Sequence, residues 1–301
     1  MKKFFLMSTL LLVAMLVSAQ TKIAPKMQKG MKKTYASEAV IKNASLKPVT
    51  ITTLTTFEVT DATEDGYVLD ALITDVTNDA DQSDTKGRII SMSTEMLKGI
   101  HTIYATDKEG KMTKIMNFNE IKERTLASID NLLSSIPLPD KEDGKQMVEK
   151  VKDMVKRELT SKLTEETLVE SLQMNTSPLA LNGKTIATGT EEEFKNNMGI
   201  KMKRTYSVTD KSNIKSSAVI NMSAEEMKQM IYNLLEKLMP SMTDEIRTGM
   251  DAMIAGIKME AKEETTYTLK ADGWVDTITS EVTSSTMGQG STVSTTVRLV
   301  K

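Results

Sequence analysis

The chain has 301 residues, with 39 basic and 41 acidic side chains, one histidine and no cysteine. Its net charge of −2 and aromatic content of 4% are unlike the basic surfaces and stacking platforms that bind nucleic acids, so we expect no nucleic-acid partner. The lack of cysteine and the single histidine, His101, exclude disulfides, thiol nucleophiles and multi-histidine zinc sites, so we predict a non-enzymatic protein without a cofactor.

Residues 1–19 have the pattern of a secretory signal peptide. Lys2 and Lys3 give a positive start, residues 4–17 are almost entirely apolar, and Ala19 is a small residue suited to cleavage. The apolar run is shorter than the roughly 20 residues that a membrane-spanning helix needs, and polar sequence follows at once. We therefore expect cleavage after Ala19 and a soluble exported protein, periplasmic or secreted, without a transmembrane segment.

Alternating apolar and polar residues predict half-buried antiparallel strands in the first half of the chain. The clearest run spans residues 49–59, and residues 100–104 form a second expected strand that contains His101. The segments 64–66 and 108–110 supply the turn residues that tight hairpins need. We interpret His101 as a structural or exposed strand residue rather than a catalytic one.

Four carboxylates gather within residues 75–84. Hard cations such as calcium prefer oxygen ligands at this density, which makes Asp79, Asp81 and Asp84 candidate metal ligands. The segment lacks the glycine and the terminal glutamate of the helix-loop-helix calcium motif. We therefore interpret it as a solvated hairpin tip and keep calcium binding as the alternative.

Helical periodicity follows in the middle of the chain. Apolar residues recur at spacings of three and four over residues 121–133 and 147–163, with prolines between the two runs. Residues 164–172 extend the second stripe, which ends before Pro178. The charged run 191–193 that comes next is interpreted as a solvated face.

The second half repeats this mixture of strands and helices. Alternation predicts strands at residues 200–208, 274–282 and 293–299, with turn sequences at 210–213, 271–273 and 288–290. In the first of these runs Ile200, Met202, Arg204, Tyr206 and Val208 share one face. Ser223 with Glu226 forms a capping-box signature, and two apolar stripes on either side of Pro240 predict a helical hairpin over residues 223–258.

Three short matches in the same order indicate that the two halves are related. The matched segments are residues 56–61 with 205–210, 90–95 with 220–225, and 104–115 with 267–278. We therefore predict an internal duplication, with pseudo-repeats at 20–178 and 179–301 in one structural unit. The expected class is α+β: a large curved antiparallel sheet, a half-barrel of about ten to twelve strands, with the inserted helical hairpins packed on it.

Methionine is the most unusual component, with 23 residues in the chain and eight of them between Met222 and Met259. Stripes of this flexible, polarisable side chain can line a surface that adapts to apolar ligands. The residues expected to line such a groove are Met227, Met230, Ile231, Leu234, Met250 and Met253. Simple core packing is the first interpretation, and soft-metal binding through paired methionines is a further alternative.

The signal ending in Ser18-Ala19-Gln20, the threonine-rich alternating strands and the two-part layout resemble uncharacterised exported proteins of Bacteroidetes-type bacteria. The expected sheet with helices packed on it is also similar, in architecture, to periplasmic lipoprotein-carrier and lipid-binding half-barrels. We therefore expect an envelope protein that binds a lipid or acyl chain between sheet and helices. The alternative is an interaction or structural module that binds another envelope protein.

Overall fold

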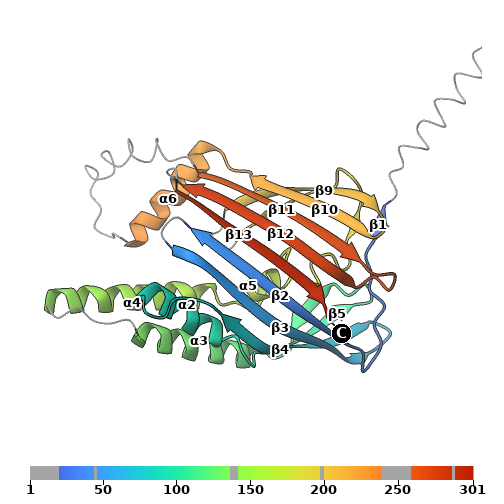
Figure 1. Ribbon diagram of the computed structural model, residues 1–301, viewed down its shortest axis with the longest axis horizontal. Helices are drawn as coiled ribbons and strands as arrows, with labels where there is room; N and C mark the ends of the chain where they lie inside the picture. The colour runs from blue at the N-terminus through green and yellow to red at the C-terminus, as the bar shows by residue number, and fades with distance from the viewer. Residues whose placement is uncertain are drawn as a thin grey trace, which may run out of the picture.

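The computed structural model describes residues 20–43, 46–135, 142–196, 200–238, 259–286 and 289–300 (Figure 1). The expected signal peptide and the second helix of the predicted hairpin 223–258 lie outside these residues. Within the described part of the chain, none of the helices combines the length and the hydrophobicity of a membrane-spanning segment.

One antiparallel sheet of eleven strands dominates the structure. In spatial order the strands are β6 (Met112–Ile115), β5 (His101–Asp107), β4 (Gly66–Asn78), β3 (Leu46–Ala62), β2 (Lys32–Asn43), β13 (Gln289–Leu299), β12 (Val275–Thr286), β11 (Met259–Leu269), β10 (Asn213–Ile220), β9 (Lys201–Asp210) and β8 (Glu191–Lys195). The sheet is open, with β6 and β8 at its edges, rather than closed into a barrel. The predicted large antiparallel sheet of ten to twelve strands is confirmed.

The predicted strands and turns occupy their expected places. The alternating runs 49–59, 200–208, 274–282 and 293–299 fall in or overlap β3, β9, β12 and β13, and His101 is the first residue of β5. Gly110 and Gly273 have φ values of +79° and +85° in the β5–β6 and β11–β12 turns, a conformation in which glycine carries no steric penalty. Local turn chemistry therefore fixes the hairpins.

Five helices interrupt the described strands. They are α2 (Thr85–Glu95), α3 (Phe118–Ser135), α4 (Glu142–Lys162), α5 (Glu165–Leu172) and α6 (Ala224–Leu238). The predicted capping box at α6 is present, because the Glu226 amide donates to Ser223 Oγ at 3.2 Å and the Ser223 amide donates to Glu226 Oε2 at 2.9 Å. Residues 165–172 form a separate helix rather than an extension of α4, because Thr164 caps it through the Thr167 amide at 3.2 Å.

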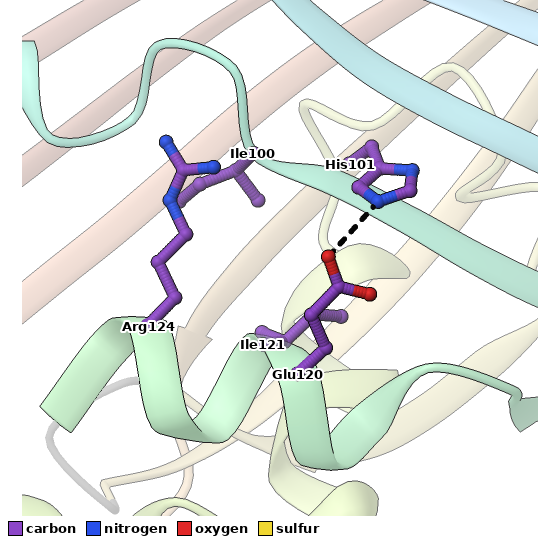
Figure 2. A pocket seen from close by; sticks show the side chains of 5 residues that line it. All are labelled: Ile100, His101, Glu120, Ile121 and Arg124. Atoms are coloured by element: carbon purple, nitrogen blue, oxygen red, sulfur yellow. Dashed lines mark hydrogen bonds and ion pairs between the residues drawn. The ribbon is translucent and has the colours of Figure 1, made fainter.

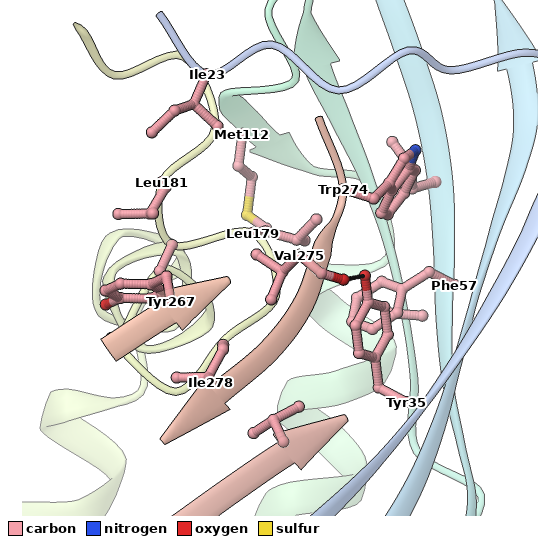
Figure 3. Packing of buried hydrophobic residues seen from close by; sticks show 14 of the residues in the cluster. Ile23, Tyr35, Phe57, Met112, Leu179, Leu181, Tyr267, Trp274, Val275 and Ile278 are labelled. Carbon is pink, nitrogen blue, oxygen red and sulfur yellow. Dashed lines mark hydrogen bonds between the residues drawn. The ribbon is translucent and has the colours of Figure 1, made fainter. Parts of the chain in front are cut away.

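The sheet buries one of its faces, which we call the core face and which carries Tyr267, Ile278 and Val297. Residues 20–31 and 174–187 close one end of this face, where β1 (Thr21–Lys22) pairs with β7 (Thr185–Ile186). Figure 3 shows the apolar packing of this closed end. The principal side chains that the closing segments add to the core are Ile23, Met27, Leu179, Leu181 and Ile186.

Two hydrogen bonds, one buried and one partly buried, join the N-terminal part of the chain to this closed end. The Tyr35 hydroxyl donates to the carbonyl oxygen of Val275 at 2.8 Å (Figure 3), and the indole nitrogen of Trp274 donates to the carbonyl oxygen of Lys26 at 3.0 Å. These partners are about 240 residues apart in sequence. The two halves of the chain are therefore joined within one sheet and one core.

The sequence matches between the halves fall on corresponding elements in part. Residues 56–61 lie in β3 and residues 205–210 in β9. Tyr104 and Tyr267 each precede a glycine turn and lie fully buried in β5 and β11. The match 90–95 with 220–225 is displaced, because it places the C-terminal half of α2 against the end of β10 and the first residues of α6. The duplication stays a prediction.

Candidate functional site

The core face is partly uncovered near its centre. Val282 on β12 lies directly opposite Val293 on β13 and Glu263 on β11, and Val293 lies opposite Ile41 on β2. Residues directly opposite one another share a sheet face, and Val282 follows the buried Ile278 by four residues, so these side chains belong to the core face. Val282 is 36% exposed, and Ile41 and Val293 are half-buried. We call Ile41, Val293 and Val282 the aliphatic row.

A charged cluster continues the same row toward the β8 edge. Glu263 lies opposite Ala218 on β10, Ala218 opposite Arg204 on β9, and Arg204 opposite Glu192 on β8. The Arg204 side chain is only 7% exposed; it contacts the Glu192 carboxylate through Nη1, and its Nη2 lies 3.6 Å from Glu263 Oε1. The guanidinium carbon lies 4.0 Å from the centroid of the Phe194 ring. Arginine is well suited to such a site, because its planar group can pair and stack at once.

Two further donors converge on the Glu192 carboxylate. Lys184 Nζ donates to Oε2 at 2.8 Å and to Oε1 at 3.2 Å, and the Tyr206 hydroxyl donates to Oε1 at 2.7 Å. Lys184 Nζ also lies 3.1 Å from the Tyr206 hydroxyl oxygen. We call Lys184, Glu192, Arg204, Tyr206 and Glu263 the Arg204 cluster. It brings together three donors and two carboxylates at the end of the aliphatic row.

The two carboxylates of the cluster have opposite electrostatic environments. Burial raises the pKa of Glu192, but Lys184, Tyr206 and Arg204 outweigh that effect and hold the pKa below its ordinary value. Burial raises the pKa of Glu263, and the single contact with Arg204 and a hydrogen bond from Thr265 at 3.2 Å offset it only in part. Glu192 is therefore the ionised partner, and Glu263 is the carboxyl group that accepts a proton more readily.

Two buried polar atoms beside the cluster have no hydrogen-bond partner among the described residues. They are Arg204 Nε and the hydroxyl oxygen of Tyr267. Burial raises the pKa of Tyr267 well above its ordinary value, and Tyr206, Arg204 and Glu263 also act on it, so its hydroxyl lies within electrostatic reach of the cluster. Buried polar groups are normally paired, so the cluster has unused hydrogen-bonding capacity.

The predicted methionine groove is only partly described. Met230 of α6 packs with Met222 and Met259 against a small cluster of Ile200, Met202 and Ala218 on the core face. Met227 and Ile231 are half-buried on the same helix, whereas the side chain of Leu234 and both Met250 and Met253 lie outside the described residues. Met230 of α6 and Phe194 pack against the same three residues, and Phe194 also contacts Arg204, so this part of α6 lies in the neighbourhood of the Arg204 cluster.

The acidic segment 75–84 is not a hairpin tip, and this interpretation is wrong. It forms the end of β4 and the connection to α2, because the chain enters a helix before β5. Asp79 Oδ1 accepts the Thr50 amide at 2.6 Å, Asp81 pairs with Lys47 at 3.1 Å, and Asp84 precedes α2. Within the described part of the chain, no three His, Asp or Glu side chains are grouped as a metal site.

His101 lies at the edge of a small hollow with Ile100, Glu120, Ile121 and Arg124 (Figure 2). Its Nε2 is 3.2 Å from Glu120 Oε1 on α3, and its Nδ1 is 3.4 Å from Asp70 Oδ1 on β4. The hollow has room for about one water molecule. His101 therefore links strand and helix, in agreement with a structural role.

Sequence reasoning missed the Arg204 cluster, although one signal was visible. Arg204 occupies an apolar position in the alternating run 200–208, and a charged residue on a buried face requires a partner. The run 191–193 was interpreted as a solvated face, which is correct for Glu191 and Glu193 but wrong for Glu192. The β8–β9 pairing turns only the middle glutamate toward the core face.

Comparisons with known proteins add only distant likenesses. A structure of lipovitellin, described by its lipid–protein interactions, has 7% identity and a TM-score of 0.36; the match covers 92% of this chain and 26% of that chain, about a quarter of its length. A porin-like protein from Bacteroides uniformis has 12% identity and a TM-score of 0.19, with 89% and 95% covered. No protein-family model and no curated protein sequence matches the chain. At these scores neither likeness indicates a shared function.

Proposed function

We propose that the protein is an exported, non-enzymatic binding protein that holds a lipid or acyl chain over the aliphatic row, between the sheet and α6. The observation that carries this proposal is the exposure of Val282, an apolar residue in the interior of an eleven-stranded sheet and on its buried face. Covering apolar surface gains about 25 cal/mol per Å², so an apolar ligand lying along the row is favoured.

The neighbourhood of the row supports a ligand of mixed character. Met230 and Met222 pack on the core face at Ile200, Met202 and Ala218, near the Arg204 end of the path, and methionine side chains adapt to apolar partners of different shape. The Arg204 cluster at one end supplies polar groups that fix orientation. Binding sites for small molecules are commonly apolar with a few convergent polar groups.

Native mass spectrometry of the full chain, purified from the envelope of an expressing bacterium, tests the proposal, with organic extraction to identify the ligand. We expect adducts of lipid or fatty-acid mass. Val282→Trp should at least halve the adduct because it fills the row, whereas Val219→Trp on the opposite sheet face should retain it. Absence of any adduct, or equal adducts in both variants, would contradict the proposal.

The alternative function, docking of another envelope protein, is favoured by a different surface. Val151 and Leu159 are exposed on α4, although both belong to its apolar stripe. A photoreactive residue in place of Val151 should then trap one specific partner in cells, and the same residue in place of Arg157 should trap none. Identical products at both positions would argue against this function.

A further inference from the structure

We propose that the ligand is an acyl chain with a free carboxylate, and that Lys184, Arg204 and Tyr206 receive this carboxylate when Glu192 withdraws from it. The inference rests on the proposed function and specifies its ligand. In the structure, the Glu192 carboxylate occupies the position where the three donors converge. The Glu192 carboxylate therefore occupies the place that we assign to the carboxylate of the ligand.

The three donors match the chemistry of a carboxylate. Arg204 presents a planar guanidinium, Lys184 a cation 2.8 Å from one carboxylate oxygen, and Tyr206 a hydroxyl 2.7 Å from the other. Arg204 and Tyr206 come from the single strand β9, and Lys184 comes from the closing segment; Tyr206 and the neighbours of Lys184, Leu181 and Ile186, belong to the main core. The site is therefore built in advance and does not depend on Glu192 for its shape.

Glu192 is the group that we expect to turn away when a ligand carboxylate enters the cluster. It lies on the five-residue strand β8, at the edge of the sheet, and its side chain is 28% exposed against 7% for Arg204. An edge strand is held by a single neighbour. When a ligand carboxylate replaces it, the Glu192 side chain can turn to water, which restores the hydration of its charge.

The charge of the cluster favours an added anion. With Glu192 turned away, Lys184 and Arg204 carry two positive charges against the one carboxyl group of Glu263, whose pKa is raised by burial. Arg204 Nε and the Tyr267 hydroxyl also lack partners among the described residues. A ligand head group would meet excess positive charge and unused donors.

The aliphatic row leads away from this cluster in the direction that an acyl chain requires. Five strand steps separate Arg204 from Ile41, or about 24 Å at ~4.8 Å per step. A lipid acyl chain spans about half of a bilayer core that is roughly 30 Å thick. The path from Arg204 across Ala218 and Glu263 to the aliphatic row is therefore long enough for one extended chain, which would reach Val282 after three strand steps, or about 14 Å.

Isothermal titration calorimetry of the full chain with lauric acid and with 1-dodecanol tests this inference, because the two probes share the alkyl chain and differ in the head group. We expect lauric acid to bind more tightly. Glu192→Gln should raise the affinity for lauric acid about tenfold, which corresponds to about 1.4 kcal/mol, and leave that for dodecanol unchanged. Lys184→Met should weaken the binding of lauric acid at least fivefold and leave the binding of dodecanol unchanged.

The adjacent Glu191→Gln is the matched control, since Glu191 is exposed on the opposite face and pairs with Lys203 at 2.8 Å. It should change neither affinity. Equal binding of acid and alcohol, unaffected by Glu192→Gln, would overturn the head-group inference and leave the proposed function standing. Binding of neither probe, to wild type or to Glu192→Gln, would overturn both. Thermal melts of each variant show that it is folded.

Discussion

Arg204 on β9 and Glu192 on the edge strand β8 form an ion pair that joins a buried guanidinium to a partly exposed carboxylate. The pair has two consequences. It anchors the last strand of the sheet to its neighbour, and it keeps a site for a carboxylate filled by the protein itself. The ion pair therefore stabilises the fold, but Glu192 competes with a ligand carboxylate for Arg204.

Replacement of Arg204 by methionine should destabilise the protein by about 3 kcal/mol, because it leaves Glu192 and Glu263 without their shared cation in a largely buried place. Urea denaturation measures this change. Arg88→Met on the exposed side of α2 is the control and should stay within about 0.5 kcal/mol of wild type. Equal effects of the two substitutions would show that the cluster contributes nothing to stability.

Two buried tyrosines should respond oppositely to removal of the hydroxyl. Tyr35→Phe leaves the buried carbonyl of Val275 without its donor and should cost about 1–3 kcal/mol. Tyr104→Phe removes a buried hydroxyl that has no partner among the described residues, so it should be neutral or stabilising. Denaturant midpoints compare the two. If Tyr104→Phe lost more stability than Tyr35→Phe, the hydrogen bond of Tyr35 and the unpaired hydroxyl of Tyr104 would both be contradicted.

The contact between the N-terminal segment and the β11–β12 turn can be tested at Gly273. A Cβ there would lie 2.9 Å from Pro25 Cα, and the φ of +85° adds strain, so Gly273→Ala should cost about 3 kcal/mol. Gly189→Ala has a similar φ of +87° with nothing within 4 Å, and should cost only about 1 kcal/mol. Thermal unfolding of both variants separates clash from strain, and equal losses would show that the N-terminal segment does not pack there.

The ionisation of His101 should make stability depend on pH. Burial lowers its pKa, but Glu120 and Asp70 outweigh this effect and raise the pKa above 6.5. The stabilisation is therefore complete below about pH 6.5 and is lost as the pH rises through the raised value. It should amount to less than about 1 kcal/mol, because the side chain is 35% exposed.

Urea denaturation at pH 6 and pH 8 checks this dependence. The advantage of wild type over His101→Gln should be larger at pH 6 than at pH 8. In an NMR titration, Glu120→Gln should lower the pKa of His101. A pKa that does not move in this variant would show that the ion pair with α3 is absent in solution.

Local patterns in the sequence were sufficient to predict the strands and helices in which apolar residues recur at regular spacing. The alternating runs in β3, β9, β12 and β13 were predictable, because one face of each strand meets the protein interior, and the periodic apolar residues of α3 and α4 predicted two helices. β2 was not identified, since its mixture of Ala, Lys and Glu weakens the alternation. Its pairing with β13, some 250 residues away, decides its conformation.

The candidate site could not be predicted from local patterns, because its residues come from segments that are distant in sequence. Arg204 was a visible anomaly, but its partners come from β8, from β11 and from the closing segment that carries Lys184. Their convergence depends on strand register and on the path of residues 174–187, and neither follows from periodicity. The methionine pattern did predict that α6 has an apolar face, and Met230 packs accordingly.

Photo-affinity labelling of the full chain with a diazirine-bearing fatty acid tests the central claim most directly. The binding of an acyl chain along the core face predicts cross-links on Val282, Val293 and Ile41, suppressed by excess lauric acid. Val219 on the opposite face should remain unlabelled. Labelling that avoids the aliphatic row, or that excess lauric acid leaves unchanged, would contradict the claim.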